Sequence, residues 1–190
     1  MALDLIQEAK NCTICAAHLP EGPRPVFTIH PDAKVVIIGQ APGRKVHVSG
    51  IPWDDASGKR LRQWLGVDED TFYNPMHFAI LPMGFCFPGT GKSGDLPPRP
   101  ECAPKWHDAF MAMMPHKALT LLIGNYAQPY YLSDRMEKNM TETVRHWQKY
   151  LPEFLPLPHP SPRNIAWFKR NPWFETEILP FLKDQVRQVI

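Results

Sequence analysis

Residues 35–43, Val35-Val36-Ile37-Ile38-Gly39-Gln40-Ala41-Pro42-Gly43, decide the fold of this 190-residue chain. Four consecutive β-branched residues predict a strand that is buried on both faces, because a half-exposed strand would alternate apolar and polar side chains. The strand runs directly into the loop GQAPG (39–43). Loops that leave the carboxyl ends of parallel strands gather at one sheet edge, where open α/β proteins bind ligands. We therefore expect GQAPG to line a ligand site.

A second segment near the other end of the chain has the same organisation. Phe154-Leu155-Pro156-Leu157 reads as a buried strand, and it is followed by His159-Pro160-Ser161-Pro162-Arg163-Asn164 (HPSPRN). If both strands belong to one parallel sheet, their loops leave from the same edge. The sequence therefore predicts that GQAPG and HPSPRN face one another across a pocket.

The rest of the chain alternates strand and helix patterns. Continuous apolar character predicts four strands, at Lys34–Ile38, Phe78–Leu81, Ala118–Ile123 and Glu153–Leu157. This alternation predicts a three-layer α/β/α sandwich around a central four-stranded, mostly parallel sheet, and we expect one domain spanning residues 1–190.

Four helices are predicted from apolar spacing and from start signals. Ser57 is expected to cap the first, which carries Leu61 and Leu65, and Pro104 to open the second. Val144, Trp147 and Leu151 mark the third. Asn171-Pro172 is expected to begin the last, with a bend at Pro180.

Composition sets broad limits. No apolar run reaches membrane-spanning length, and the start of the chain lacks the features of a signal peptide, so we expect a cytoplasmic protein without membrane contact, and a monomer. The net charge of +2 decides nothing about nucleic acid, and the local placement of basic residues matters more.

The four cysteines are related to one irregular segment. Cys12 and Cys15 form a CxxC pair, and Cys86 and Cys102 bracket most of residues 84–103, a Gly- and Pro-rich stretch without periodicity. A structureless loop of that length is uncommon unless something holds it. Four thiolates can hold a [4Fe–4S] cluster or a zinc ion, and the residues alone leave this choice open. A redox pair or four unrelated thiols are the alternatives.

The two loops and the order of the cysteines resemble the uracil-DNA glycosylase superfamily, from Cys12 to about Asn171. HPSPRN is most similar to the single-strand-selective branch, and the cysteine layout to the iron–sulfur branches called families 4 and 5. The resemblance implies a glycosylase that acts on DNA containing a damaged or deaminated base, and the absence of an identifiable lysine nucleophile predicts that it is monofunctional. It also implies a [4Fe–4S] cluster, rather than zinc, held by Cys12, Cys15, Cys86 and Cys102.

The first motif departs from its relatives in carrying no acid. Families 4 and 1 have a carboxylate where this chain has Gln40 and Ala41, respectively. Family 5 instead uses an aspartate in a downstream GxPF…DxSG segment, and residues 50–58 here read GIPWDDASG. The resemblance therefore gives Asp55 the carboxylate role, positioning water, and gives Trp53 the role of stacking on the base. Their alternatives are a helix-capping aspartate and a core tryptophan.

Other site roles follow from the chemistry of base excision. His159 is expected to donate a hydrogen bond to the departing base, with backbone N–H groups of Gln40 and Ala41 on the other side. The base-reading asparagine of families 1 and 4 has no counterpart in residues 81–84, LPMG, which leaves Asn125 as a substitute candidate. From the residues alone, Asp54 is a rival to Asp55.

DNA contacts are expected around both loops. Ser161 is expected to bind a phosphate, and Arg163 to fill the gap that a flipped nucleotide leaves. Basic residues flank the motifs, at Arg44, Lys45, Lys59, Arg60, Arg62, Lys169 and Arg170, although Lys59 and Arg62 also fit a solvated helix face. The competing function is a damaged-DNA or single-strand binding protein that keeps this fold without base excision.

Overall fold

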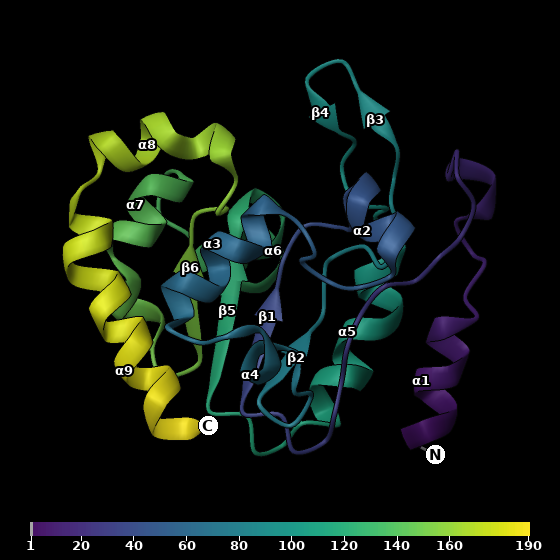
Figure 1. The fold of residues 1–190 in the computed structure, drawn as a ribbon, viewed down its shortest axis with the longest axis horizontal. Coiled ribbons are helices and arrows are strands. Elements are labelled where there is room, and N and C mark those ends of the chain that lie inside the picture. The colour runs from purple at the N-terminus through teal and green to yellow at the C-terminus, as the bar shows by residue number, and fades with distance from the viewer. Residues whose placement is uncertain (1) are drawn as a thin grey trace.

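The computed structural model describes residues 2–190, with side chains from residue 4 onward, and a four-stranded sheet lies at its centre (Figure 1). The strands are β1 (Val35–Ile38), β2 (Phe78–Ile80), β5 (Leu119–Ile123) and β6 (Phe154–Leu157), in the order β2-β1-β5-β6. All three pairings are parallel. The expected α/β/α sandwich is confirmed, and each strand is one residue shorter than predicted.

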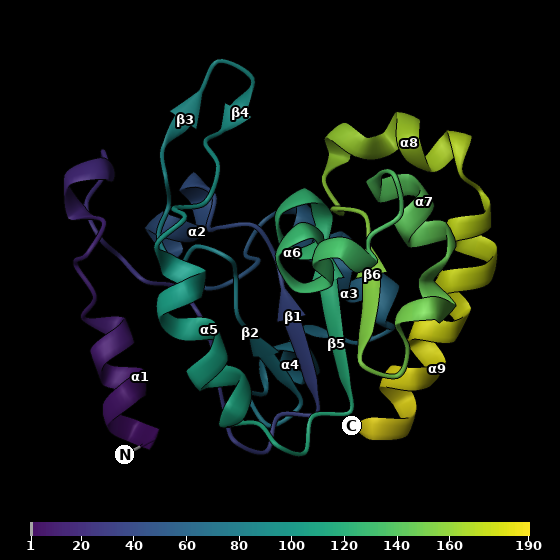
Figure 2. The same cartoon turned by 180° about the vertical axis from the view of Figure 1, so that it is seen from behind.

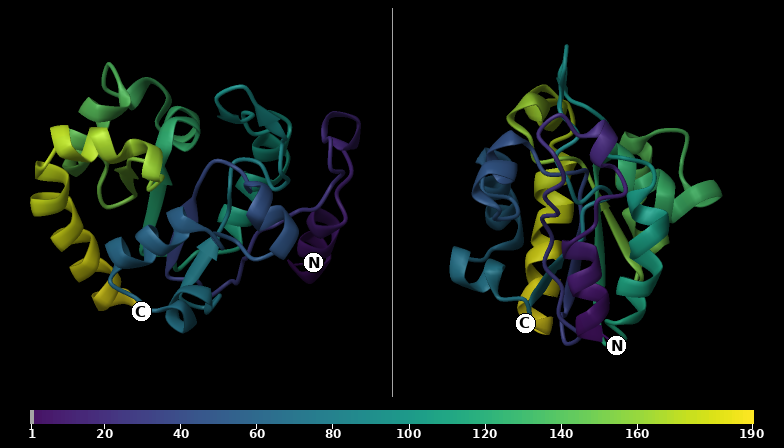
Figure 3. Two further views of the ribbon diagram at one scale, coloured as in Figure 1. Left: turned by 45° about the horizontal axis from the view of Figure 1, so that its top comes forward. Right: turned by 90° about the vertical axis from the view of Figure 1, so that its right-hand side faces the viewer.

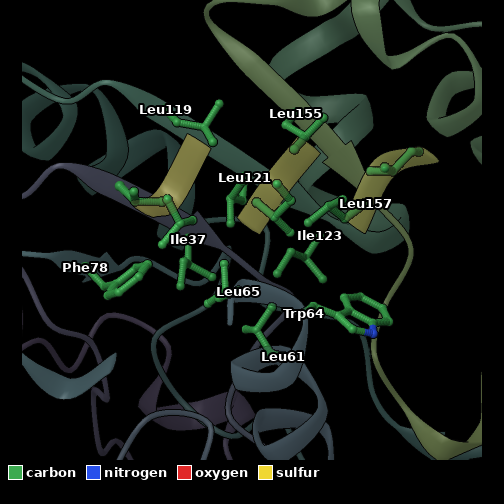
Figure 4. Close-up of a cluster of buried hydrophobic side chains, with 14 of the residues drawn as sticks. Ile37, Leu61, Trp64, Leu65, Phe78, Leu119, Leu121, Ile123, Leu155 and Leu157 are labelled. Atoms are coloured by element: carbon green, nitrogen blue, oxygen red, sulfur yellow. The ribbon is translucent and has the colours of Figure 1, made fainter. Parts of the chain in front are cut away.

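The β-branched side chains of β1 contribute to two separate hydrophobic cores, one on each face of the sheet. Val35 and Ile37 belong to one buried cluster, and Val36 and Ile38 to another, because successive side chains of a strand point to opposite faces. Figure 4 shows part of the first cluster, where Ile37 lies among side chains from the neighbouring strands and from one helix. The sheet is therefore covered on both faces, as its continuous apolar strands require.

Helices form the outer layers, as the right-hand view in Figure 3 shows. The first cluster takes side chains from α3 (Ala56–Leu65), α4 (Glu69–Tyr73), α7 (Met140–Arg145) and α9 (Leu179–Val189). The second takes them from α1 (Ala2–Lys10), α5 (Cys102–Ala112) and α6 (Gly124–Leu132). Two short helices, α2 (Arg44–Ser49) and α8 (Ile165–Arg170), follow the two loops that end β1 and β6.

The predicted helix starts need correction at two places. Asp55, not Ser57, caps α3, because its extended backbone lets its side chain accept the N–H of Gly58 at 2.8 Å. The second helix begins at Cys102, two residues before Pro104. Proline is tolerated there because the N–H groups of the first helical turn have no partner within the helix.

The two C-terminal helix predictions were too simple. The third pattern divides into α7 and a 3₁₀ turn at Trp147–Tyr150. The last begins just after Asn171-Pro172, as predicted, but consists of a π-helical turn at Phe174–Ile178 followed by α9. Pro180 lies in the first turn of α9, directly after the π-helical turn, rather than in the middle of a bent helix.

The irregular segment contains a hairpin that the sequence did not reveal. Strands β3 (Thr90–Gly91) and β4 (Gly94–Asp95) pair antiparallel within it. The hairpin projects beyond the end of the sheet from which GQAPG and HPSPRN leave (Figures 1 and 2). Across residues 2–190, no helix combines the length and apolar character needed to span a membrane.

Candidate active site

GQAPG and HPSPRN line a single pocket of about 550 Å³ beyond the carboxyl ends of the strands. The expectation that they face one another is therefore met by the geometry. The other predicted site residues reach the same pocket from two further segments of the chain, residues 50–58 and the start of α6. Those lining it are Gln40, Ala41, Trp53, Asp55, Asn125, His159, Ser161 and Arg163. Asp54 is not part of the lining, which separates it from Asp55.

His159 lies at the inner part of HPSPRN with a defined ring orientation. Its Nδ1 atom accepts the backbone N–H of Ser161 at 3.2 Å, and its carbonyl accepts the side-chain amide of Asn164 at 2.8 Å. Burial lowers the pKa of His159, while the charge of Asp55 acts in the opposite direction. The imidazole is therefore neutral near pH 7, with its proton on Nε2.

Trp53 is held against His159 by an unusual backbone. Its φ is 58°, in the left-handed region, and its ring centroid lies 5.6 Å from that of His159. Two glycines make room for it. A Cβ at Gly39 would lie 2.8 Å from the indole, and one at Gly58 would lie 1.7 Å from the Trp53 carbonyl oxygen. The indole also packs against the first core cluster, so Trp53 both contributes to the core and lines the pocket.

Asp55 is the capping aspartate that the sequence offered as an alternative, and it also lies at the pocket. One carboxylate oxygen, Oδ1, caps α3 through Gly58, and the residue also lines the pocket. The cap fixes the side chain, because an N-cap aspartate must keep its oxygen over the first helical turn. A fixed carboxylate beside a pocket is suited to orient a water molecule or to stabilise positive charge on a ligand.

The wall formed by GQAPG is tied to the segment that follows β2. The N–H groups of Met83 and Gly84 bind the carbonyls of Gly39 and Gln40 at 2.9 and 3.0 Å. Pro82, which also lines the pocket, stands where an amide side chain was missing from the sequence pattern. Asn125 reaches the pocket from the first turn of α6 and is exposed.

HPSPRN is supported by an arginine whose role the sequence did not reveal. The sequence predicts Arg60 to be one of the basic residues that contact DNA. In the structure its Nη1 instead donates to the carbonyls of Pro160 and Ser161, each at 3.2 Å. The Ser161 hydroxyl accepts the N–H of Arg163 at 3.2 Å, which caps a short 3₁₀ turn at Pro162–Asn164. Hydrogen bonds from one arginine to two successive carbonyls restrict the backbone of the loop. The sequence shows only that Arg60 lies on the predicted helix, and not that it contacts HPSPRN.

Arg163 crosses from HPSPRN to the β3–β4 hairpin. Its Nη1 donates to the carbonyl of Ser93 at 2.9 Å. The hairpin also places Asp95 in the pocket lining. Asp95 was missed because residues 84–103 showed no periodicity from which a hairpin, or its direction, could be read.

The basic rim is narrower than predicted. Arg62 is wrongly placed in it, because its side chain is 12% exposed and pairs with Glu69 at 2.8 Å. Arg44 pairs with Glu21. The remaining basic residues beside the two loops are exposed and available to a polyanion, namely Lys45, Lys59, Lys169 and Arg170.

The four cysteines line one small cavity between the N-terminal segment and α5. Burial raises the pKa of the Cys102 thiol to about 12, and the Phe85 N–H, which donates to its Sγ at 3.3 Å, offsets only part of this rise. Among residues 4–190 there is no preformed group of three or more His, Cys, Asp or Glu side chains around one ion position. The convergence of four soft sulfur donors on one cavity nevertheless fits a metal cluster or a thiophilic ion.

The family model of the uracil DNA glycosylase superfamily matches residues 27–183. The match includes GQAPG, Trp53, Asp55 and HPSPRN, and it implies a glycosylase type of function on DNA. On this evidence, the chain belongs to the uracil DNA glycosylase superfamily.

Proposed function

We propose that this protein is a monofunctional DNA glycosylase that removes uracil or another deaminated base by hydrolysing its N-glycosidic bond. The observation that carries the proposal is the convergence of Trp53, Asp55 and His159 on one pocket. These three side chains offer an aromatic face, a carboxylate and a neutral hydrogen-bond donor. Removal of a base from deoxyribose needs all three kinds of group.

The first step is capture of the base outside the DNA stack, because a duplex hides the glycosidic bond. Trp53 supplies the stacking surface, and stacking on an aromatic side chain contributes about 1–3 kcal/mol per base. Gly39 supports this role, since any side chain there would displace the indole.

Bond cleavage places negative charge on the base and positive character on the sugar. The C1′–N bond breaks with its electron pair passing to the base, and Nε2–H of His159 stabilises the resulting anion. Asp55 orients a water molecule whose oxygen bonds to C1′, and a water proton passes to the carboxylate or to solvent. A preorganised donor of this kind typically contributes roughly a hundredfold to a thousandfold in rate.

DNA binding is assigned to the rim of the pocket. The Ser161 hydroxyl, which can donate its O–H, is proposed to bind a phosphate, and the exposed lysines provide a salt-dependent attraction. Arg163 is the residue proposed to occupy the space of the flipped nucleotide. In the free protein it bonds to Ser93, so it must exchange that carbonyl for DNA.

The cysteine cavity is proposed to hold a [4Fe–4S] cluster through Cys12, Cys15, Cys86 and Cys102, with structural zinc as the alternative. Its contribution is structural. It would attach the N-terminal segment to both ends of the irregular loop, and therefore hold the β3–β4 hairpin beside the DNA face.

A panel of oligonucleotides tests the function. Each carries one uracil, hypoxanthine, xanthine or hydroxymethyluracil. Release of the base leaves an abasic site, and alkali converts that site into a strand break. Strand breaks that depend on both Asp55 and His159 support the glycosylase. Tight binding to the modified strands without breaks would instead support the non-catalytic DNA-binding protein.

A further inference from the structure

Asp95 places a second carboxylate in the pocket, next to the loop that has no acid of its own. It ends the β3–β4 hairpin and lines the pocket together with GQAPG. A Cβ added to Gly43 would lie 3.2 Å from Oδ2 of Asp95. Because Gly43 has no side chain, the carboxylate forms that part of the pocket wall.

The cations around Asp95 are engaged elsewhere. The charges that act on it are those of Arg163, Arg44 and Asp55. Arg163 donates to the carbonyl of Ser93, and Arg44 pairs with Glu21. A carboxylate has about four lone-pair positions, so Asp95 can accept an N–H from a ligand in the pocket even beside two arginines.

The hairpin fixes the position of this carboxylate. Thr90 pairs with Asp95 across the two strands, and the N–H of Leu96 binds the carbonyl of Gly89 at 2.8 Å. Gly94 has a φ of 136°, and a Cβ there would lie 2.1 Å from Nη1 of Arg163. The close approach of Arg163 thus depends on a glycine directly before Asp95.

We propose that Asp95 is a base-reading residue whose carboxylate accepts the ring N–H of a lactam base. Deamination converts a ring nitrogen acceptor beside an amino group into a ring N–H beside a carbonyl, so lactams are the class that deamination produces. His159 offers a donor to a carbonyl, and Asp95 offers the matching acceptor to the N–H. Pro82, two residues after β2, has no amide side chain with which to make that contact.

Asn125 is the competing reader, since its amide oxygen is also an acceptor at the pocket. The two residues approach from different segments, the hairpin and the first turn of α6. Removing each one separately therefore identifies which of them reads the base.

The test measures DNA binding. It rests on the proposed function in one respect, because the wild-type protein must prefer the uracil strand before any variant can be compared with it. The probe is an oligonucleotide with one 2′-fluoro-2′-deoxyuridine, in which fluorine disfavours the cationic sugar and preserves the bond. The matched control strand carries 2′-fluoro-2′-deoxycytidine, which lacks the ring N–H. The measured quantity is the ratio of the two dissociation constants for wild type, Asp95→Ala, Asp95→Asn and Asn125→Ala.

We expect Asp95→Ala to lower the preference for the uracil strand by about 10-fold or more, the value of a charge-assisted hydrogen bond. Asp95→Asn should keep most of the preference, because its amide oxygen still accepts an N–H. Asp70→Ala, on the exposed surface of α4, is the matched control and should bind as wild type. Melting temperatures of all variants confirm that each is folded.

Three results would overturn the inference. One is an unchanged preference in Asp95→Ala, and another is its loss in Asn125→Ala alone. The third is normal binding of the probe by both Asp95 variants together with equally slow base release from unmodified uracil-containing DNA, which would make Asp95 a water-activating group. A wild-type protein that shows no preference for the uracil strand would contradict the proposed function itself, before any variant is compared.

Discussion

Ser161 donates its backbone N–H to Nδ1 of His159 at 3.2 Å, and this contact determines which nitrogen of the ring faces the pocket as a donor. Burial keeps the ring neutral by lowering its pKa. A neutral imidazole that is fixed on one side by its own loop can offer only Nε2–H to a ligand. The HPSPRN loop therefore orients His159 so that its Nε2–H is the ring donor that remains for a ligand.

The first prediction concerns the arginine behind that loop. Arg60→Ala should lower base release at saturating DNA by roughly tenfold, because two hydrogen bonds that position HPSPRN are lost. Lys59→Ala, an exposed neighbour on α3, should lower DNA affinity slightly and leave the rate at saturation unchanged. Single-turnover rates separate the two effects, and equal rate losses in both variants would refute the positioning role of Arg60.

The second prediction concerns the space that Gly39 leaves for Trp53. Gly39→Ala should slow base release and lower the melting temperature, because its Cβ would lie 2.8 Å from the indole. In a Trp53→Ala background the same substitution should cost little, since the clash is gone. The coupling in this double-mutant cycle is the measurement. Additive effects would show that the two residues are independent.

The third prediction concerns acid stability and His107. This residue is fully buried, with Nε2 at 3.0 Å from the carbonyl of Pro82 and Nδ1 at 2.7 Å from the hydroxyl of Tyr131. Burial lowers the pKa of His107 to about 4 from its ordinary value of 6.5. Because the unfolded chain binds the proton first, the stabilising effect is complete above pH 6.5 and is lost as the pH falls toward 4.

Urea unfolding at pH 7 and pH 4.5 checks this prediction against His107→Gln. The wild type should lose about 2–3 kcal/mol more unfolding free energy than the variant over that interval. The amide of the variant does not titrate, so the carboxylates of the chain affect both proteins alike. Parallel losses in the two proteins would contradict the assignment.

The fourth prediction concerns the cysteine cavity. Protein purified without oxygen should be brown and contain about four iron and four sulfide per chain, as a [4Fe–4S] cluster requires. Cys86→Ala should lose iron and lower the melting temperature, because the irregular loop loses its anchor. Ser57→Ala, remote from the cavity, should keep the iron. Colourless protein with one zinc per chain would decide for the alternative.

The sequence predicted the elements whose signal is local and missed those that depend on distant contacts. Continuous apolar runs located all four strands of the sheet, and the loops that follow β1 and β6 could be placed at one edge because parallel strands must share it. The start of α3 was misplaced, because Asp55 and Ser57 are both good capping residues and only the backbone at Asp55 decides between them.

The residues that line the pocket could be predicted from the sequence mainly where they belong to a recognisable motif. GQAPG, Trp53, Asp55 and HPSPRN could be recognised together, whereas Arg60 and Asp95 could not. Arg60 acts through carbonyls about a hundred residues away along the chain. Asp95 lies on a hairpin of two-residue strands, which leave no periodic pattern. Neither position can be inferred before the chain is folded.

In the proposed function, Asp55 and His159 act together in base removal. The most direct measurement is the single-turnover rate of base release from uracil-containing DNA by wild type, Asp55→Ala and His159→Ala, with DNA affinity measured in parallel. Each variant should be slower by roughly a hundredfold or more while its affinity for DNA persists. Wild-type rates in both variants, on every base that the protein releases, would contradict the account.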